Sequence, residues 1–394
     1  MKVDAIAAER SRRFWLTPES CDLDEFRRVV DRRTDPADYP LANAIRADVP
    51  IYDADAIRAA AGDEVARKAL MAEWAEAMLT GPGIVVFEKA FTDLATLDAA
   101  TRIFQEIIDE QRRDRSGGGD HFAEPGANDR VWNALEKLCL GAPEVFARYY
   151  ANEAIAMVAQ AWLGAGYQIT SQINVVDPGG EAQSVHRDYH MGLQSAEEIA
   201  AFPVHAHKLS PAMTLQGAVA HCEMPLDSGP TLYLPFSQNF VPGYFAWRRP
   251  EFIAYFDSHH VQLPLAKGDA AFFNPALFHA AGDNRTKDVR RMANLLQISS
   301  PYGRAMESVD RTRMAKALYP TLLGMNDLTA REKANAIAAA ADGYAFPTNL
   351  DRDPPIGGLA PPTQQHLMRR ALAEGWEPAA FAEALDRRAE RRVA

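Results

Sequence analysis

Hydrophobic and polar residues follow three different patterns along the chain, and each pattern predicts a different kind of structure. In residues 1–80, apolar residues recur at roughly helical spacing among many charges, as in residues 63–79, which predicts a helical extension. Residues 81–91 read GPGIVVFEKAF, a turn signal before a β-branched apolar run, which predicts a strand. Between residues 167 and 300, short apolar runs are separated by DPGGE, DSGP, KGD and GDN, which is typical of an all-β unit.

Beyond residue 301 the helical pattern returns, for example in residues 330–343. We therefore predict a helical N-terminal extension over residues 1–80, a mainly β core over residues 81–304 and a helical C-terminal region over residues 305–394. A total of 394 residues is compatible with one large core that carries helical additions. The first residues lack an apolar stretch of the signal-peptide type, and no run of 18 apolar residues occurs, so we expect no membrane span and a cytoplasmic location.

Charge and cysteine content narrow the range of functions. The chain has 42 Lys and Arg against 53 Asp and Glu, a formal charge of -11, which disfavours binding to nucleic acids and to anionic membranes. Its three cysteines are far apart, so they predict neither a disulfide framework nor a thiolate zinc site. We expect a small-molecule substrate, and the oligomeric state is not predicted.

The segment SVHRDYH, residues 184–190, carries the strongest chemical signal. In a strand, alternate side chains share a face, so His186 and Asp188 would point together. The segment FFNPALFHAAGDN supplies His279 just after a predicted strand. Two imidazoles and one carboxylate on one side of a metal form the facial triad of non-haem Fe(II) oxygenases, and we predict that these three residues are catalytic metal ligands.

A cation follows the third ligand at a short distance. Arg290 lies eleven residues after His279, at the start of the run RRMANLLQIS, which predicts another strand. A 2-oxoglutarate dianion that chelates iron needs a cation for its remote carboxylate, and arginine offers a bidentate fork. Strand alternation would place Arg291 on the opposite face, in a solvated or salt-bridged position.

This combination of motifs resembles the phytanoyl-CoA dioxygenase family. The resemblance rests on H-x-D, a histidine roughly ninety residues later and an arginine at plus eleven, and on the stretches SQINVVDPGGEAQSVHRD, SGPTLYLPFSQ and KGDAAFFNPALFHAAGDNRTKDVRRMANLLQIS. It covers about residues 81–300. It implies a double-stranded β-helix, a cupin-like jelly roll, with Fe(II), 2-oxoglutarate and O2. The implied reaction is hydroxylation of an unactivated C–H bond, with release of succinate and CO2.

The resemblance also implies contacts to the co-substrate from the strand before H-x-D. In YQITSQINVV, four polar residues share one strand face, and among them Gln172 and Asn174 are the candidates. At Ala281 the chain departs from some family members, which have a hydroxyl side chain there. Ala281 therefore cannot help Arg290 to bind the remote carboxylate of 2-oxoglutarate, as a hydroxyl side chain could.

Two alternatives remain open at the level of sequence. A cupin-type metal enzyme would use His186 and Asp188 with His190 or His279, without 2-oxoglutarate. A non-catalytic binding protein would use the same scaffold. In the leading interpretation, His190 lies on the face of His186 if the strand continues, where substrate contact or hydrogen bonding to a ligand suits it better than metal binding.

Overall fold

A computed structural model describes residues 2–114, 128–181 and 183–393. These residues group into two units. Unit 1 comprises Met1–Ala90, Gly119–Asp129 and Asn174–Leu295. Unit 2 comprises Phe91–Gly118, Arg130–Ile173 and Leu296–Ala394.

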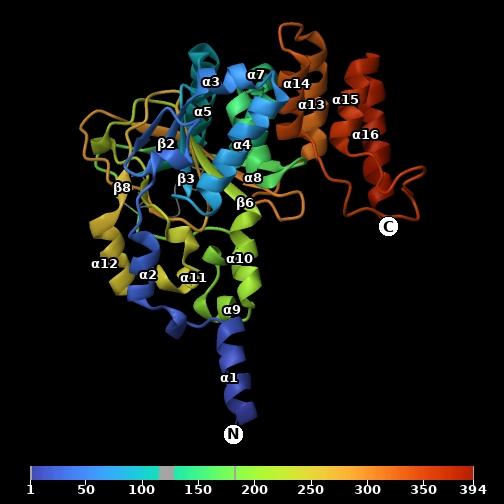
Figure 1. Ribbon diagram of the computed structural model, residues 1–394. Coiled ribbons are helices and arrows are strands. Elements are labelled where there is room, and N and C mark those ends of the chain that lie inside the picture. Colours follow the sequence, from blue (N-terminus) through green and yellow to red (C-terminus); the bar gives the residue numbers. More distant parts are fainter. Residues whose placement is uncertain (1, 115–127, 182, 394) are drawn as a thin grey trace. The chain divides into compact units, whose positions relative to one another are not determined.

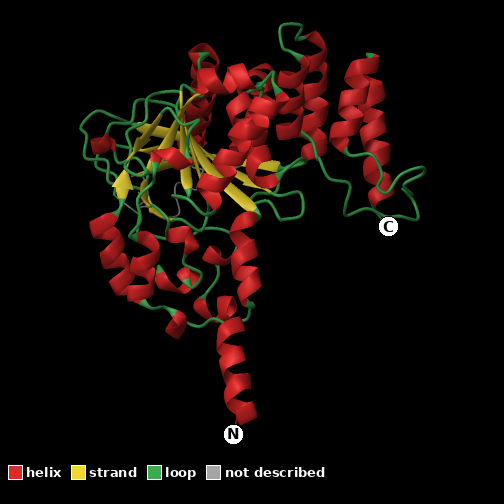
Figure 2. Ribbon diagram, in the orientation of Figure 1, coloured by secondary structure: helices red, strands yellow, loops and turns green. Residues whose placement is uncertain are grey.

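The strands form two sheets, drawn as yellow arrows in Figure 2. The larger has the order β1-β2-β3-β9-β6-β11-β5-β4, and the smaller has the order β10-β7-β8. The strands are β1 (Ala44–Arg46), β2 (Val49–Asp53), β3 (Ile84–Glu88), β4 (Asn128–Val131), β5 (Gln168–Val176), β6 (Thr214–Ala220), β7 (Leu232–Leu234), β8 (Val261–Gln262), β9 (Ala270–Phe273), β10 (Phe278–Ala280) and β11 (Arg291–Ser299). Strands β4, β5 and β11 contribute residues to both units.

The larger sheet is mixed, because β2 pairs with β3 in parallel whereas β9 runs antiparallel to both β3 and β6. Its central strands are buried on both faces. Every residue of β6 and of β9 is buried, as expected for strands that are covered on two sides. Gly217 of β6 faces Phe272 of β9, and a Cβ at residue 217 would lie 2.4 Å from that ring. The absence of a side chain there allows the two strands to pair.

The N-terminal region differs from the prediction. Helices are present, namely α1 (Lys2–Phe14), α2 (Leu23–Val30), α3 (Ala54–Ala60) and α4 (Glu64–Leu79), but residues 44–53 form the strands β1 and β2. The prediction of a wholly helical extension is therefore wrong at this point. The run VPIYD of β2 has four buried residues followed by a half-buried one. Such a short apolar run does not distinguish a buried strand from a helix by its period alone.

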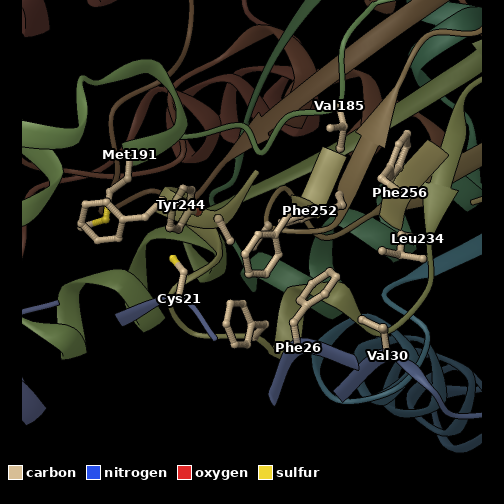
Figure 3. Close-up of a cluster of buried hydrophobic side chains, with 14 of the residues drawn as sticks. Cys21, Phe26, Val30, Val185, Met191, Leu234, Tyr244, Phe252 and Phe256 are labelled. Atoms are coloured by element: carbon tan, nitrogen blue, oxygen red, sulfur yellow. The ribbon is translucent and has the colours of Figure 1, made fainter. Parts of the chain in front are cut away.

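The remaining helices of unit 1 pack around a hydrophobic cluster (Figure 3). They are α9 (Ala196–Ala200), α10 (Val204–Ala212), α11 (Gly243–Ala246) and α12 (Pro250–His259). Phe26 of α2 lies at the centre of the aromatic contacts, with its ring centroid 5.2 Å from Phe240 and 5.1 Å from Phe252. Figure 1 shows α2 beside α12. This cluster fixes the N-terminal segment on the small sheet, because Leu234 and Phe278 belong to it.

A second hydrophobic cluster of unit 1 lies between strands of both sheets. It contains Ile84, Ala271, Phe273 and Tyr233, and the half-buried Ala293 of β11 packs against it. The Phe273 ring lies 4.8 Å from the imidazole of His279, measured between ring centroids. This cluster therefore forms one wall beside the third predicted metal ligand.

Unit 2 is mainly helical, and its helices are α5 (Leu94–Asp114), α6 (Ala134–Gly141), α7 (Pro143–Tyr150), α8 (Glu153–Leu163), α13 (Arg311–Gly324), α14 (Ala330–Ala340), α15 (Gln364–Glu374) and α16 (Pro378–Arg392). The Asp93 carboxylate caps the start of α5, because it accepts from the backbone N–H of Ala95 and Thr96. Thr329 and Glu332 form a capping box at the start of α14, which satisfies two N–H groups reciprocally. Among the described residues, the helices are too short or too polar to cross a lipid bilayer.

Candidate metal centre

The three predicted metal ligands come together in unit 1. His186, Asp188 and His279 each offer one ligand atom, and these three atoms lie within 4.8 Å of one another. The Oδ2 atom of Asp188 is 3.7 Å from Nε2 of His186 and 3.4 Å from Nε2 of His279. Two imidazole nitrogens and one carboxylate oxygen therefore converge on one point. That donor set suits a divalent transition metal.

The backbone around His186 is extended but does not form a regular strand. His186 makes an isolated bridge with His279 of β10, and Asp188 N–H donates to the carbonyl of Pro275 at 3.0 Å. The chain then bends at Tyr189 and His190. The strand therefore does not continue to His190, and the condition under which His190 would share the face of His186 is not met. The alternation that brings His186 and Asp188 together holds over residues 186–188.

Both imidazoles are oriented by backbone carbonyls. The Nδ1 atom of His186 lies 2.9 Å from the carbonyl oxygen of Ser184, and Nδ1 of His279 lies 2.8 Å from that of Leu277. A carbonyl only accepts, so each Nδ1 carries the proton and each Nε2 keeps its lone pair. This tautomer leaves both Nε2 atoms ready to bind a metal.

The electrostatics of the cluster favour metal-binding protonation states. Burial lowers the pKa of His186, and the neighbouring His279 lowers it further, so the imidazole is neutral near pH 7. Burial alone would raise the pKa of Asp188, but His186, His279 and an N–H donor from Gln216 together hold that pKa well below its usual range. Asp188 is therefore ionised under the same conditions.

Arg187, between the two ligands, lies against the rings of Tyr244 and Phe278 and is 2% exposed. Its Nη2 donates to the backbone carbonyls of Ser237 and Phe240, and its guanidinium carbon lies 5.3 Å from the ring centroid of Tyr244 and 5.1 Å from that of Phe278. Cation–π contact and hydrogen bonds together compensate a buried charge. This side chain anchors the segment that carries His186 and Asp188.

Gln216 is a further residue of the site, one that the sequence pattern did not single out. Its Nε2 donates to Asp188 Oδ2 at 2.6 Å, and the residue is 6% exposed on β6. The available signal was a polar residue in the otherwise apolar run TLQGAVA, since a buried amide needs a partner. His190 is placed away from the group of three ligand atoms, with Nε2 3.3 Å from the hydroxyl of Thr214.

The two arginines lie differently from the prediction. Arg290 immediately precedes β11 and forms ion pairs with Asp129 at 2.6 Å and with Asp177 at 2.9 Å, its side chain being 33% exposed. Arg291 is only 7% exposed, and its Nη1 donates to the carbonyls of Ser228 and Gly282. The expectation of a solvated or salt-bridged Arg291 is therefore wrong. The salt-bridged arginine is Arg290.

The row of polar residues on β5 is buried or half-buried and does not form an exposed sheet face. Gln172 is 1% exposed and belongs to unit 2, where its Oε1 accepts from Arg130 Nη1 at 2.9 Å and its Nε2 donates to Gln297 Oε1 at 3.4 Å. Asn174 is half-buried. The contacts of Gln172 and Asn174 with a co-substrate stay predictions.

A family model describes most of this region. Residues 58–292, more than half of the chain, match the phytanoyl-CoA dioxygenase model. The matched span contains all three residues of the triad. Arg290 and Arg291 also fall inside it.

A single relative matches a smaller part of the chain than the family model does. The dioxygenase trt7 of Aspergillus terreus is 30% identical over 138 residues, which are 33% of this chain and 38% of that protein. The alignment thus spans well under half of this relative's length.

Among solved structures, the non-haem α-ketoglutarate-dependent epimerase SnoN from nogalamycin biosynthesis is 17% identical, with 59% of this chain and 84% of that chain covered and a TM-score of 0.40. The carbocyclase SnoK from the same biosynthesis is 20% identical, with 57% and 83% covered and a TM-score of 0.41. Structural similarity at this level supports no further argument.

Proposed function

Because the chain belongs to the phytanoyl-CoA dioxygenase family, we propose that it is an Fe(II)- and 2-oxoglutarate-dependent dioxygenase whose metal is held by His186, Asp188 and His279. The observation that carries the proposal is the convergence of three ligand atoms within 4.8 Å. The residues fit the metal, since two neutral imidazoles and an ionised carboxylate are the donors of a facial triad.

The rest of the chain prepares these donors. Two backbone carbonyls set the histidine tautomers, and Arg187 anchors the segment between the first two ligands. Three protein ligands on one side of an octahedral metal leave three positions, enough for a bidentate keto acid and O2. When bound, Fe(II) with 2-oxoglutarate and O2 would supply the oxidising power for C–H hydroxylation, with release of succinate and CO2.

For the remote carboxylate of 2-oxoglutarate, the geometry favours Arg291 over the predicted Arg290. Arg291 shares a strand face with Ala293, two residues further along β11, and Ala293 packs against the cluster that borders His279. Of the described residues, none offers Arg291 a carboxylate within ion-pair distance, and its acceptors are the carbonyls of Ser228 and Gly282.

A buried guanidinium whose acceptors are backbone carbonyls can in addition bind an anion. Burial lowers the pKa of Arg291 to about 10, so the side chain keeps its positive charge near pH 7. Arg290, in contrast, already has two carboxylate partners. Arg290 as the anchor remains the prediction of the sequence pattern, and Arg291 is the anchor that we propose.

We further propose that the two sheets are the halves of a double-stranded β-helix, and that the substrate is a small organic molecule with an unactivated C–H bond. The direct test is succinate formation from 2-oxoglutarate in the presence of Fe(II), O2 and a library of such molecules. Wild type should release succinate with at least one of them, and Asp188→Ala should not. Equal release by wild type and by this variant would remove the proposed site from the reaction.

A further inference from the structure

The side chain of Gln216 touches the oxygen that Asp188 presents to the two histidines. Its Nε2 donates to Asp188 Oδ2 at 2.6 Å. The same Oδ2 is the atom that lies 3.7 Å and 3.4 Å from the imidazole nitrogens. An ionised carboxylate only accepts hydrogen bonds, so the amide must face Asp188 with its N–H end. The orientation of the amide follows from chemistry.

The other end of the same amide is unsatisfied. Gln216 is 6% exposed, and its Oε1 is buried without a hydrogen-bond partner among the described residues. A buried carbonyl oxygen that has lost water without gaining a donor destabilises a fold. Gln216 therefore donates a hydrogen bond to Asp188 while its own carbonyl oxygen has no donor. Packing and stability alone would favour an apolar side chain at this position.

The amide matters most when a metal is bound. Across the part of the chain that the structure describes, the polar side chains beside the Asp188 carboxylate are the two imidazoles and Gln216. In the tautomer set by the Ser184 and Leu277 carbonyls, each Nε2 carries a lone pair for a metal and no proton, so neither nitrogen can donate to the carboxylate. The backbone of Asp188 is fixed by the hydrogen bond from its N–H to the carbonyl of Pro275, but this hydrogen bond does not set the rotation of the carboxylate group. Gln216 is the remaining donor that does.

We propose that Gln216 is a positioning residue that orients the Asp188 carboxylate for metal binding and is retained for this role at a cost to stability. The inference rests on the proposed function, because it assumes that the triad binds a metal. Residues that orient metal ligands by hydrogen bonds typically change metal affinity by about 10-fold to 100-fold when they are replaced.

The test uses Gln216→Met, which keeps the length of the side chain and removes both amide ends. The dissociation constant for Fe(II) under anaerobic conditions, with Co(II) as an air-stable second probe, should rise by about 10-fold or more. The urea midpoint of the metal-free protein should stay equal or rise, since the unsatisfied carbonyl is gone. Gln216→Leu serves as a second variant of similar volume.

Gln238 provides a matched control in the same unit. Its Nε2 donates to a backbone carbonyl, that of Gly81 at 2.8 Å, and its Oε1 is likewise buried without a hydrogen-bond partner in the described chain. Gln238→Met should leave the metal dissociation constant unchanged. If Gln216→Met binds metal as tightly as wild type, or if it only loses stability, the proposal is overturned. If wild type itself binds no metal, the proposed function fails instead.

Discussion

His186 and His279 exchange two backbone hydrogen bonds, from His186 N–H to the His279 carbonyl at 3.0 Å and from His279 N–H to the His186 carbonyl at 3.2 Å. Two ligands that are roughly ninety residues apart in the sequence are thus held in register by the backbone. Their ring centroids lie 4.4 Å apart. The site is assembled by the fold itself, so metal binding does not have to bring distant segments together.

Replacing any one member of the triad should impair iron binding. His186→Ala, Asp188→Ala and His279→Ala each leave two protein ligands, fewer than a facial triad needs. We expect wild type to contain about one Fe(II) per chain after anaerobic reconstitution, and each variant to contain much less. His259→Ala is the control, because that exposed imidazole stacks on Tyr255. Full iron content in all three variants would exclude the site.

The two neighbouring arginines should differ in their effect on co-substrate binding. Arg291→Ala removes a buried charge-assisted contact, which costs about 2–5 kcal/mol in 2-oxoglutarate binding. Arg290→Ala removes two partly exposed ion pairs, worth about 0–1 kcal/mol each to stability, and should leave that affinity nearly unchanged. Titration of both variants with 2-oxoglutarate decides between them. A larger loss at Arg290 would restore the assignment made from the sequence pattern.

The segment between the first two ligands should be sensitive to the residue that faces Arg187. A Cβ at Gly243 would lie 1.9 Å from the guanidinium carbon of Arg187, so Gly243→Ala should destabilise the protein by about 1–3 kcal/mol through overpacking. Gly62→Ala is the control, since no atom lies within 4 Å of its added Cβ. The urea midpoints of the two variants provide the comparison. Similar midpoints would show that the guanidinium moves away at no cost.

Residue alternation over a few positions was enough to predict the convergence of His186 and Asp188, because the backbone there is extended. The alternation does not extend to the next two residues. The chain bends at Tyr189 and His190, and nothing in the local sequence opposes continuation of the strand. His279 was found because a second motif accompanies it, not because its pairing with His186 is encoded nearby.

The roles of Gln216 and Arg291 depend on tertiary structure. Gln216 becomes a partner of Asp188 only when β6 is placed beside the triad, and a single polar residue in an apolar strand does not name its partner. For Arg290 and Arg291, alternation predicted different environments, and in the structure Arg291 is the buried one. Alternation could not decide which environment was which, because the assignment depends on Asp129 and Asp177, which come from segments distant in the sequence.

The central claim is that the triad leaves room for a chelating keto acid, and optical titration tests it most directly. Addition of 2-oxoglutarate to the anaerobic Fe(II) protein should produce a weak visible charge-transfer band, because the keto acid must bind the metal directly. His190→Ala should give the same band, since His190 Nε2 lies beside Thr214 and not among the ligand atoms. A band in both proteins is the predicted result. A band only in the variant would make His190 a fourth ligand, and absence of the band from both iron-loaded proteins would contradict the claim.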